Sequence, residues 1–158
     1  MKRCAGLDLA ALEKNPSGYF FKRGKILFSD EEILKMVERD GIEILAVDSP
    51  LSLSKGGYRS CDRAIRNLGI RILPLSVPSM RMLTKRGVRL KERLERMGVR
   101  VIETYPHAVI VLDEGARRVF NRVKGTKHEK DAAVCRWVAV AYSRGKARGF
   151  GKVHKIWI

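Results

Sequence analysis

The sequence predicts a single α/β domain in which helices cover the faces of a mixed β-sheet. Three short strand candidates precede the first helical pattern, and apolar runs then alternate with amphipathic segments. A chain of 158 residues is long enough for one sizeable core, and it shows no internal repeat or domain boundary. Residues 1–158 are therefore expected to form one domain.

The first part of the chain predicts three strands and a helix. Residues 3–10 are apolar except for one aspartate and are expected to form a core strand. Residues 17–28 hold two aromatic-rich segments around a Lys-Arg-Gly turn, which is typical of a hairpin. Ser29 and Glu32 have the spacing of a capping box, so a helix is expected from there to Gly41.

The remainder of the chain predicts alternating strands and helices. The expected elements are a buried strand, a short helix, a long helix, a strand, a final helix and an edge strand, at residues 42–47, 59–67, 79–97, 99–104, 127–143 and 153–158. Residues 109–112 are compatible with either a strand or a helix. Residues 147–152 are expected to be a Gly-rich basic linker.

The charge of the chain points to a polyanionic partner. Lysine and arginine number 33 against 17 acidic residues, for a net charge of +16. Nucleic acid, DNA or RNA, is the expected partner. The absence of glutamine and the presence of only three asparagines also suit a thermophile, but thermophile surfaces balance bases with acids.

Location and cysteine content exclude several classes of protein. No apolar run is long enough to cross a bilayer and no secretory signal is evident, so no membrane association is expected and the predicted compartment is the cytoplasm. The three cysteines are widely spaced and contain no CxxC pair, which argues against a disulfide framework or a zinc site.

Asp8 is the most informative single residue. Aspartate is depleted in strands and costly to bury, and buried charges concentrate at functional sites. Gly6 and Ala10 share its face of the strand and are small, so we expect room for a ligand beside it. The alternative is a structural carboxylate satisfied by arginine or by backbone amides.

Three further acids lie where a site would form. Asp48 and Glu103 end the next two core strands, and Asp131 begins the apolar face of the last helix. A turn aspartate, a surface glutamate and a helix-dipole aspartate are the competing interpretations. Carboxylates gathered in one cleft repel, and hard divalent ions such as Mg²⁺ or Mn²⁺ relieve the repulsion. All four acids are therefore predicted metal ligands and catalytic residues.

Basic segments are the expected contacts for phosphates. Residues 79–100 contain eight lysines and arginines against two glutamates. The predicted nucleic-acid contacts are Arg59, Lys85, Arg86 and Lys127, with a solvated helix surface as the alternative for each.

Six short blocks of the sequence resemble a known family. They are Gly6–Ala10, Ala46–Leu51, Gly57–Asp62, Leu83–Gly87, Glu103–Pro106 and Asp131–Cys135. In this order they resemble the domain-of-unknown-function 429 family, described as predicted nucleases. The resemblance implies a ribonuclease H-like fold, with five strands in a mixed sheet and helices on both faces.

The resemblance also implies a set of site residues. Ribonuclease H-like nucleases and resolvases carry acids on the first and fourth strands and on the last helix. Asp8, Asp48 and Asp131 match that pattern, and Glu103 is an additional candidate. The implied activity is metal-dependent hydrolysis of phosphodiester bonds by two metal ions.

Two other functions are compatible with the sequence. A non-catalytic nucleic-acid-binding protein could keep the same fold and charge, and it would show no metal-dependent cleavage. A phosphotransferase is the third class, although actin-like kinases need two such domains. The choice of DNA or RNA and the oligomeric state, including a homodimer, are left open by the sequence.

Overall fold

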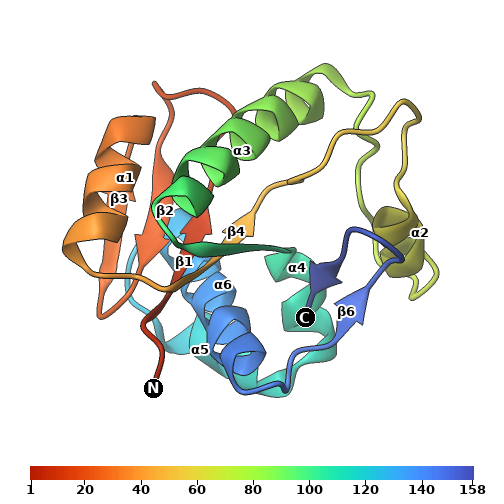
Figure 1. Cartoon of the computed structure of the whole chain (residues 1–158). Helices are drawn as coiled ribbons and strands as arrows, with labels where there is room; N and C mark the ends of the chain where they lie inside the picture. Colours follow the sequence, from red (N-terminus) through yellow and green to blue (C-terminus); the bar gives the residue numbers. More distant parts are fainter.

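A seven-stranded mixed sheet organises the chain, which the computed structural model describes over residues 1–158 (Figure 1). The strands are β1 (Cys4–Asp8), β2 (Ser17–Phe20), β3 (Gly24–Leu27), β4 (Ile44–Asp48), β5 (Arg100–Thr104), β6 (Gly149–Phe150) and β7 (Ile156–Trp157). Their order across the sheet is β3-β2-β1-β4-β5-β7-β6. β1, β4, β5 and β7 run parallel, while β2, β3 and β6 pair antiparallel with their neighbours.

The expected α/β class is confirmed, but the implied count of five strands is wrong. The C-terminal segment adds the hairpin β6–β7, and β7 lies between β5 and β6 rather than at the edge. Arg148 and Ile158 exchange backbone hydrogen bonds, and the Thr104 hydroxyl donates to the Trp157 carbonyl at 2.7 Å. These bonds attach the predicted basic linker to the sheet as its edge strand.

Six helices complete the fold. They are α1 (Asp30–Arg39), α2 (Ser60–Arg66), α3 (Pro78–Arg96), α4 (Pro106–Leu112), α5 (Glu114–Arg122) and α6 (Lys127–Ser143). The ambiguous segment at residues 109–112 is helical, within α4. α5 was not expected from the sequence; it begins where the Asp113 side chain accepts a hydrogen bond from Ala116 N. None of the helices has the length and apolar character that crossing a membrane requires.

Helices cover both faces of the sheet (Figure 1), and an apolar layer lies between the helices and the sheet on each face. Leu7 and Leu45 pack against α1 and α3, whereas Cys4 and Ala46 pack against α4, α5 and α6. Alternate residues of one strand thus serve different layers, as the pleat of a strand requires. In β1 and β4, the side chains of the even-numbered residues, such as Cys4 and Ala46, therefore face α6.

Local sequence explains where the helices that frame the sheet begin. Ser29 and Glu32 form the predicted capping box at α1, and Thr126 and Glu129 form a second one at α6. The second box fixes the residue at which α6 begins. The first turn of α6 therefore lies at the C-terminal end of β1 and the start of β2.

Candidate metal centre

Asp8 and Asp48 lie side by side at the carboxyl ends of neighbouring parallel strands. The register of β1 and β4 pairs Asp8 directly with Asp48, so both side chains leave the same face of the sheet. That face is the one covered by α6, because Cys4 and Ala46 point to it as well. The sheet therefore brings together two acids that are 40 residues apart in sequence.

The backbone of α6 lies directly on β1 and β2. A Cβ atom on Gly6 would lie 2.0 Å from the Ala132 carbonyl oxygen, and one on Gly18 would lie 1.9 Å from that of His128. Only glycine permits this approach at either position. The expected room for a ligand beside Gly6 is therefore filled by helix backbone.

The close contact places the first turns of α6 at the strand acids. His128 Nδ1 lies 2.8 Å from Asp8 Oδ2, and Asp131 is buried on the same side. Asp131 also receives a hydrogen bond from Lys127 Nζ at 2.5 Å. β1, β4 and α6 thus gather three carboxyl groups and an imidazole at the carboxyl ends of the parallel strands.

Burial and mutual repulsion raise the pKa values of the strand acids. Burial is the largest effect on the pKa of Asp48, and the charges of Asp8 and Asp131 raise it further, well above its usual range. The pKa of Asp8 is raised by burial and by Asp131, while its hydrogen bond with His128 opposes the rise. Like charges brought close together in this way disfavour the ionised form of each carboxyl group.

The donor set suits a hard divalent cation. No arginine pairs with Asp8 or Asp48, and the half-buried Asp48 carboxyl accepts no hydrogen bond within the chain. Carboxylate oxygens are the ligands that Mg²⁺ and Mn²⁺ prefer, whereas an imidazole nitrogen is a ligand more typical of zinc, copper, iron and nickel. Asp8, Asp48, Asp131 and His128 could hold such an ion.

Glu103 lies apart from these acids. In the β4–β5 register it pairs with Val47, one position before Asp48, so its side chain leaves the opposite face of the sheet. Its carboxylate is bound by Arg59 at 2.6 Å and 2.9 Å and by His154 Nε2 at 2.6 Å. Glu103 is therefore held by Arg59 and His154 on the other face of the sheet from the Asp8 centre.

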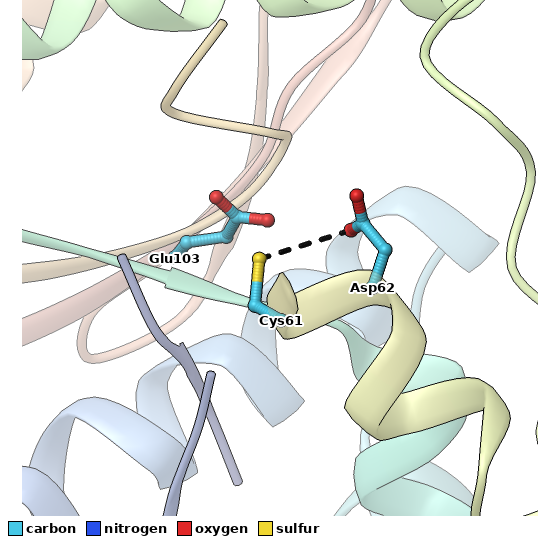
Figure 2. A group of neighbouring side chains, drawn as sticks. All are labelled: Cys61, Asp62 and Glu103. Carbon is cyan, nitrogen blue, oxygen red and sulfur yellow. Dashed lines mark hydrogen bonds between the residues drawn. The ribbon is translucent and has the colours of Figure 1, made fainter. Parts of the chain in front are cut away.

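A second buried acidic group surrounds Glu103 (Figure 2). Figure 2 shows the Cys61 thiol and the Asp62 and Glu103 carboxyl groups pointing toward one another. Arg59 offsets part of the negative charge of this group, because its guanidinium binds Asp62 at 2.7 Å as well as Glu103. Burial raises the pKa of Cys61 to about 12, so its thiol remains protonated at neutral pH. The group is a buried ion-pair network rather than a metal centre.

The pKa of Glu103 reflects the same network. Burial raises it, but the hydrogen bonds from His154 and Arg59 outweigh burial and hold it below the usual range. Leu51 N also donates to Glu103 at 2.8 Å. The network ties the loop after β4, the start of α2 and the C-terminal hairpin to β5.

The four predicted phosphate contacts divide into two pairs. Lys85 and Lys127 are exposed, and Lys127 lies beside the acids of the candidate centre. Arg59 and Arg86 are buried instead. Arg86 binds Asp30 at 2.9 Å and two backbone carbonyls, so neither buried arginine is available to a phosphate.

His128 is a candidate site residue that is not among the acids and bases expected from the sequence. The available signal was its position three residues before Asp131 in the first turn of a helix, which places the two side chains on one face. The structure adds the contact with Asp8, which the sequence could not show.

The sequence matches the model of one protein family. A family model described as "Protein of unknown function (DUF429)" matches residues 21–130, which is more than half of the chain. The chain belongs to the DUF429 family. The matched segment of this DUF429 protein contains Asp48 and His128, whereas Asp8 and Asp131 lie just outside it. No curated protein matches the sequence.

A solved structure resembles the DUF429 protein across most of its length. T. thermophilus RuvC, in complex with a Holliday junction substrate, has a TM-score of 0.55 and 14% sequence identity. The match covers 89% of this chain and 94% of RuvC. At this identity the comparison shows the fold, which is ribonuclease H-like with the sheet extended to seven strands.

Proposed function

We propose that this DUF429 protein is a metal-dependent nuclease that hydrolyses phosphodiester bonds of nucleic acid. The observation that carries the proposal is the direct pairing of Asp8 with Asp48, on the face where α6 brings Asp131 and His128. Two acids at the carboxyl ends of parallel strands, with Asp131 and His128 of α6 beside them, form a donor set where α/β proteins bind ligands. The overall charge of +16 suits a polyanionic substrate.

The residues of the centre have distinct roles in this proposal. Asp8, Asp48 and Asp131 supply oxygen ligands, and His128 supplies a nitrogen or orients Asp8. Two divalent ions held there would activate a water and stabilise the leaving oxygen of an in-line displacement. Lys127 neutralises Asp131 in the metal-free protein and, being mostly exposed, can turn to a phosphate.

A basic groove along α3 offers a path for the substrate. It has a volume of about 560 Å³ and runs between the loop after β4 and the first turns of α3. Lys55, Arg81 and Lys85 line it together with serine and threonine hydroxyls, and no acid does. Gly87 of α3 packs against Ser49, which follows Asp48 directly, so α3 contacts the loop that begins after the acid of β4.

The comparison with RuvC supports the proposal at the level of fold. RuvC was solved with a nucleic acid bound, and the ribonuclease H-like sheet of this protein presents its acids at the ends of β1, β4 and α6. A non-catalytic binding protein is the alternative that the surface charge also suits. Metal-dependent cleavage separates the two.

Cleavage of a panel of labelled substrates tests the proposal. Single-stranded, duplex and junction forms of DNA and RNA are incubated with and without Mn²⁺. We expect the wild type to cleave at least one substrate with Mn²⁺, and Asp8→Asn and Asp48→Asn to lose cleavage while they retain binding. Glu38→Gln, an exposed acid on α1, is the charge-matched control and should cleave normally.

Two outcomes would contradict the nuclease proposal. Metal-independent cleavage that survives in both aspartate variants would place the activity elsewhere. Binding without cleavage of any substrate, by a preparation whose melting temperature rises with Mn²⁺, would favour the binding protein.

In the groove, Arg81→Ala with Lys85→Ala should weaken substrate binding and leave the Mn²⁺-induced melting shift unchanged.

A further inference from the structure

A second basic pocket lies far from the candidate metal centre. It has a volume of about 370 Å³ and is lined by five cationic side chains, two aromatic ones and a single acid. The cations are Arg3, Lys22, Arg23, Lys25 and Arg39. They come from the start of β1, the β2–β3 turn, β3 and the end of α1, so the fold gathers charges that are separate in sequence.

Position separates this pocket from the metal centre. Arg3 precedes β1 and Asp8 ends it, which is a span of roughly 17 Å along an extended strand. Tyr19, in the pocket wall, pairs with Leu7 and packs in the core layer of α1 and α3, whereas Asp8 faces α6. The pocket therefore lies at the other end and on the other face of the sheet.

Four of the five cations of the pocket have no anionic partner, and the exception is Arg39. Lys25 Nζ lies 3.7 Å from Met36 Sδ, and Nη2 of Arg39 lies 2.8 Å from the same sulfur atom. A thioether sulfur is only a weak hydrogen-bond acceptor and carries no charge. The only acid, Asp40, already accepts from the Tyr19 hydroxyl at 2.9 Å and pairs with Arg39 at 3.3 Å. Most of the positive charge is thus uncompensated.

The aromatic ring in the pocket is already engaged by cations. The Arg3 guanidinium lies 5.4 Å and the Lys22 ammonium 5.8 Å from the centre of the Phe21 ring. A base that stacked on this ring would have to displace them. The pocket therefore favours an anionic group over a nucleobase, and arginine with lysine is the pairing that binds phosphate.

We propose that this pocket is a phosphate-binding site, formed by Arg3, Lys22, Arg23, Lys25 and Arg39. The ligand is a multiply charged phosphate, either a free polyphosphate or the phosphodiester backbone of a nucleic acid. The site does not depend on the metal centre, so it goes beyond the proposed nuclease function and can be tested without cleavage.

Two probes distinguish the sources of phosphate. Pyrophosphate represents the free ligand and is titrated calorimetrically into the full chain at low salt. A short DNA duplex represents the backbone, and its binding constant is measured as a function of salt concentration. The test variant is Lys22→Gln with Arg23→Gln, two exposed residues of the β2–β3 turn.

A matched variant controls for the loss of net charge. Lys146→Gln with Arg148→Gln removes the same charge at exposed positions beside β6, which is the opposite edge of the sheet from β3. We expect pyrophosphate binding to weaken by at least about 10-fold in the turn variant only, since charge-assisted hydrogen bonds are lost. Asp8→Asn should bind pyrophosphate like the wild type.

The duplex has its own expected result. Two lost phosphate contacts should reduce the slope of log K against log salt concentration by about 1.8 in the turn variant, and not in its control. A change with either probe that is confined to the turn variant supports the site and identifies the source. Equal effects in the turn variant and its control, or no effect with either probe, would overturn the proposal.

Discussion

Replacing Asp48 by asparagine should stabilise the metal-free protein. Asp48 and Asp8 are paired across β1 and β4, and burial together with the neighbouring charges raises the pKa of both. Asparagine keeps the size of the side chain and removes its charge. The same substitution should abolish stabilisation by Mn²⁺, so its effect on stability should change sign when the metal is added.

The spacing of the strands sets the magnitude. Neighbouring strands lie about 4.8 Å apart, so two carboxylates that face each other at roughly 5 Å repel by about 3 kcal/mol at an effective dielectric constant near 20. Lys127 offsets part of this repulsion. We expect a gain of about 1–3 kcal/mol for Asp48→Asn without metal, which is a rise in melting temperature of about 2–10 °C.

The pH dependence has a definite sign. An acid whose folded-state pKa is raised binds its proton more tightly when folded, so the fold loses stability as the pH rises from the unfolded-state to the folded-state pKa. The advantage of Asp48→Asn over the wild type should therefore be small near the unfolded-state pKa of aspartate. It should grow with pH and become constant above the folded-state pKa of Asp48.

Thermal melts in EDTA and in Mn²⁺ measure both effects. At 100 times the Kd, bound metal stabilises the wild type by about 2.7 kcal/mol. Glu38→Gln is the control and should behave like the wild type in both buffers. Lower stability of Asp48→Asn in EDTA, or an undiminished Mn²⁺ shift in this variant, would refute the electrostatic reasoning.

Three further substitutions test other parts of the structure. Gly6→Ala should cost about 1–3 kcal/mol in urea denaturation because its Cβ would meet α6, whereas Gly56→Ala, with open space around it, should cost little. Glu103→Gln should cost about 3–5 kcal/mol by leaving the buried Arg59 partly unpaired, and the loss should shrink as the pH falls through the lowered pKa of Glu103; an unchanged Mn²⁺ shift would place it outside the metal centre. His128→Ala should raise the Mn²⁺ concentration for half-maximal stabilisation by about 10- to 100-fold, and an unaltered midpoint would exclude His128 from the site.

Local patterns in the sequence predicted the elements that local interactions form. The Ser29 capping box, the long amphipathic helix α3 and the largely buried helix α6 were expected within one or two residues. β6 and β7 contain two residues each, too few to carry a periodic pattern, and their pairing depends on contacts with β5. The shape of the sheet's last edge was therefore not readable from the sequence.

The site shows the same limit. Asp8, Asp48 and Glu103 give the same signal, an acid at the end of an apolar run, but the register of parallel strands decides which face each occupies. That register arises from packing between distant segments. Arg59 and Lys85 are both basic residues in basic segments, so the sequence alone does not distinguish their roles. They differ in the fold, where Arg59 binds two buried carboxylates.

The glycine contacts between α6 and the strands limit how the acid cluster can adjust. Gly6 and Gly18 place main chain against main chain, and main-chain separations cannot be changed by a different rotamer. Making room for a larger ion between the acids would require α6 to move away from the sheet. We therefore expect discrimination by ionic radius, with Ca²⁺ competing poorly against Mn²⁺ in a melting assay, since Ca²⁺ prefers ligand distances longer by about 0.3 Å or more than Mg²⁺ does.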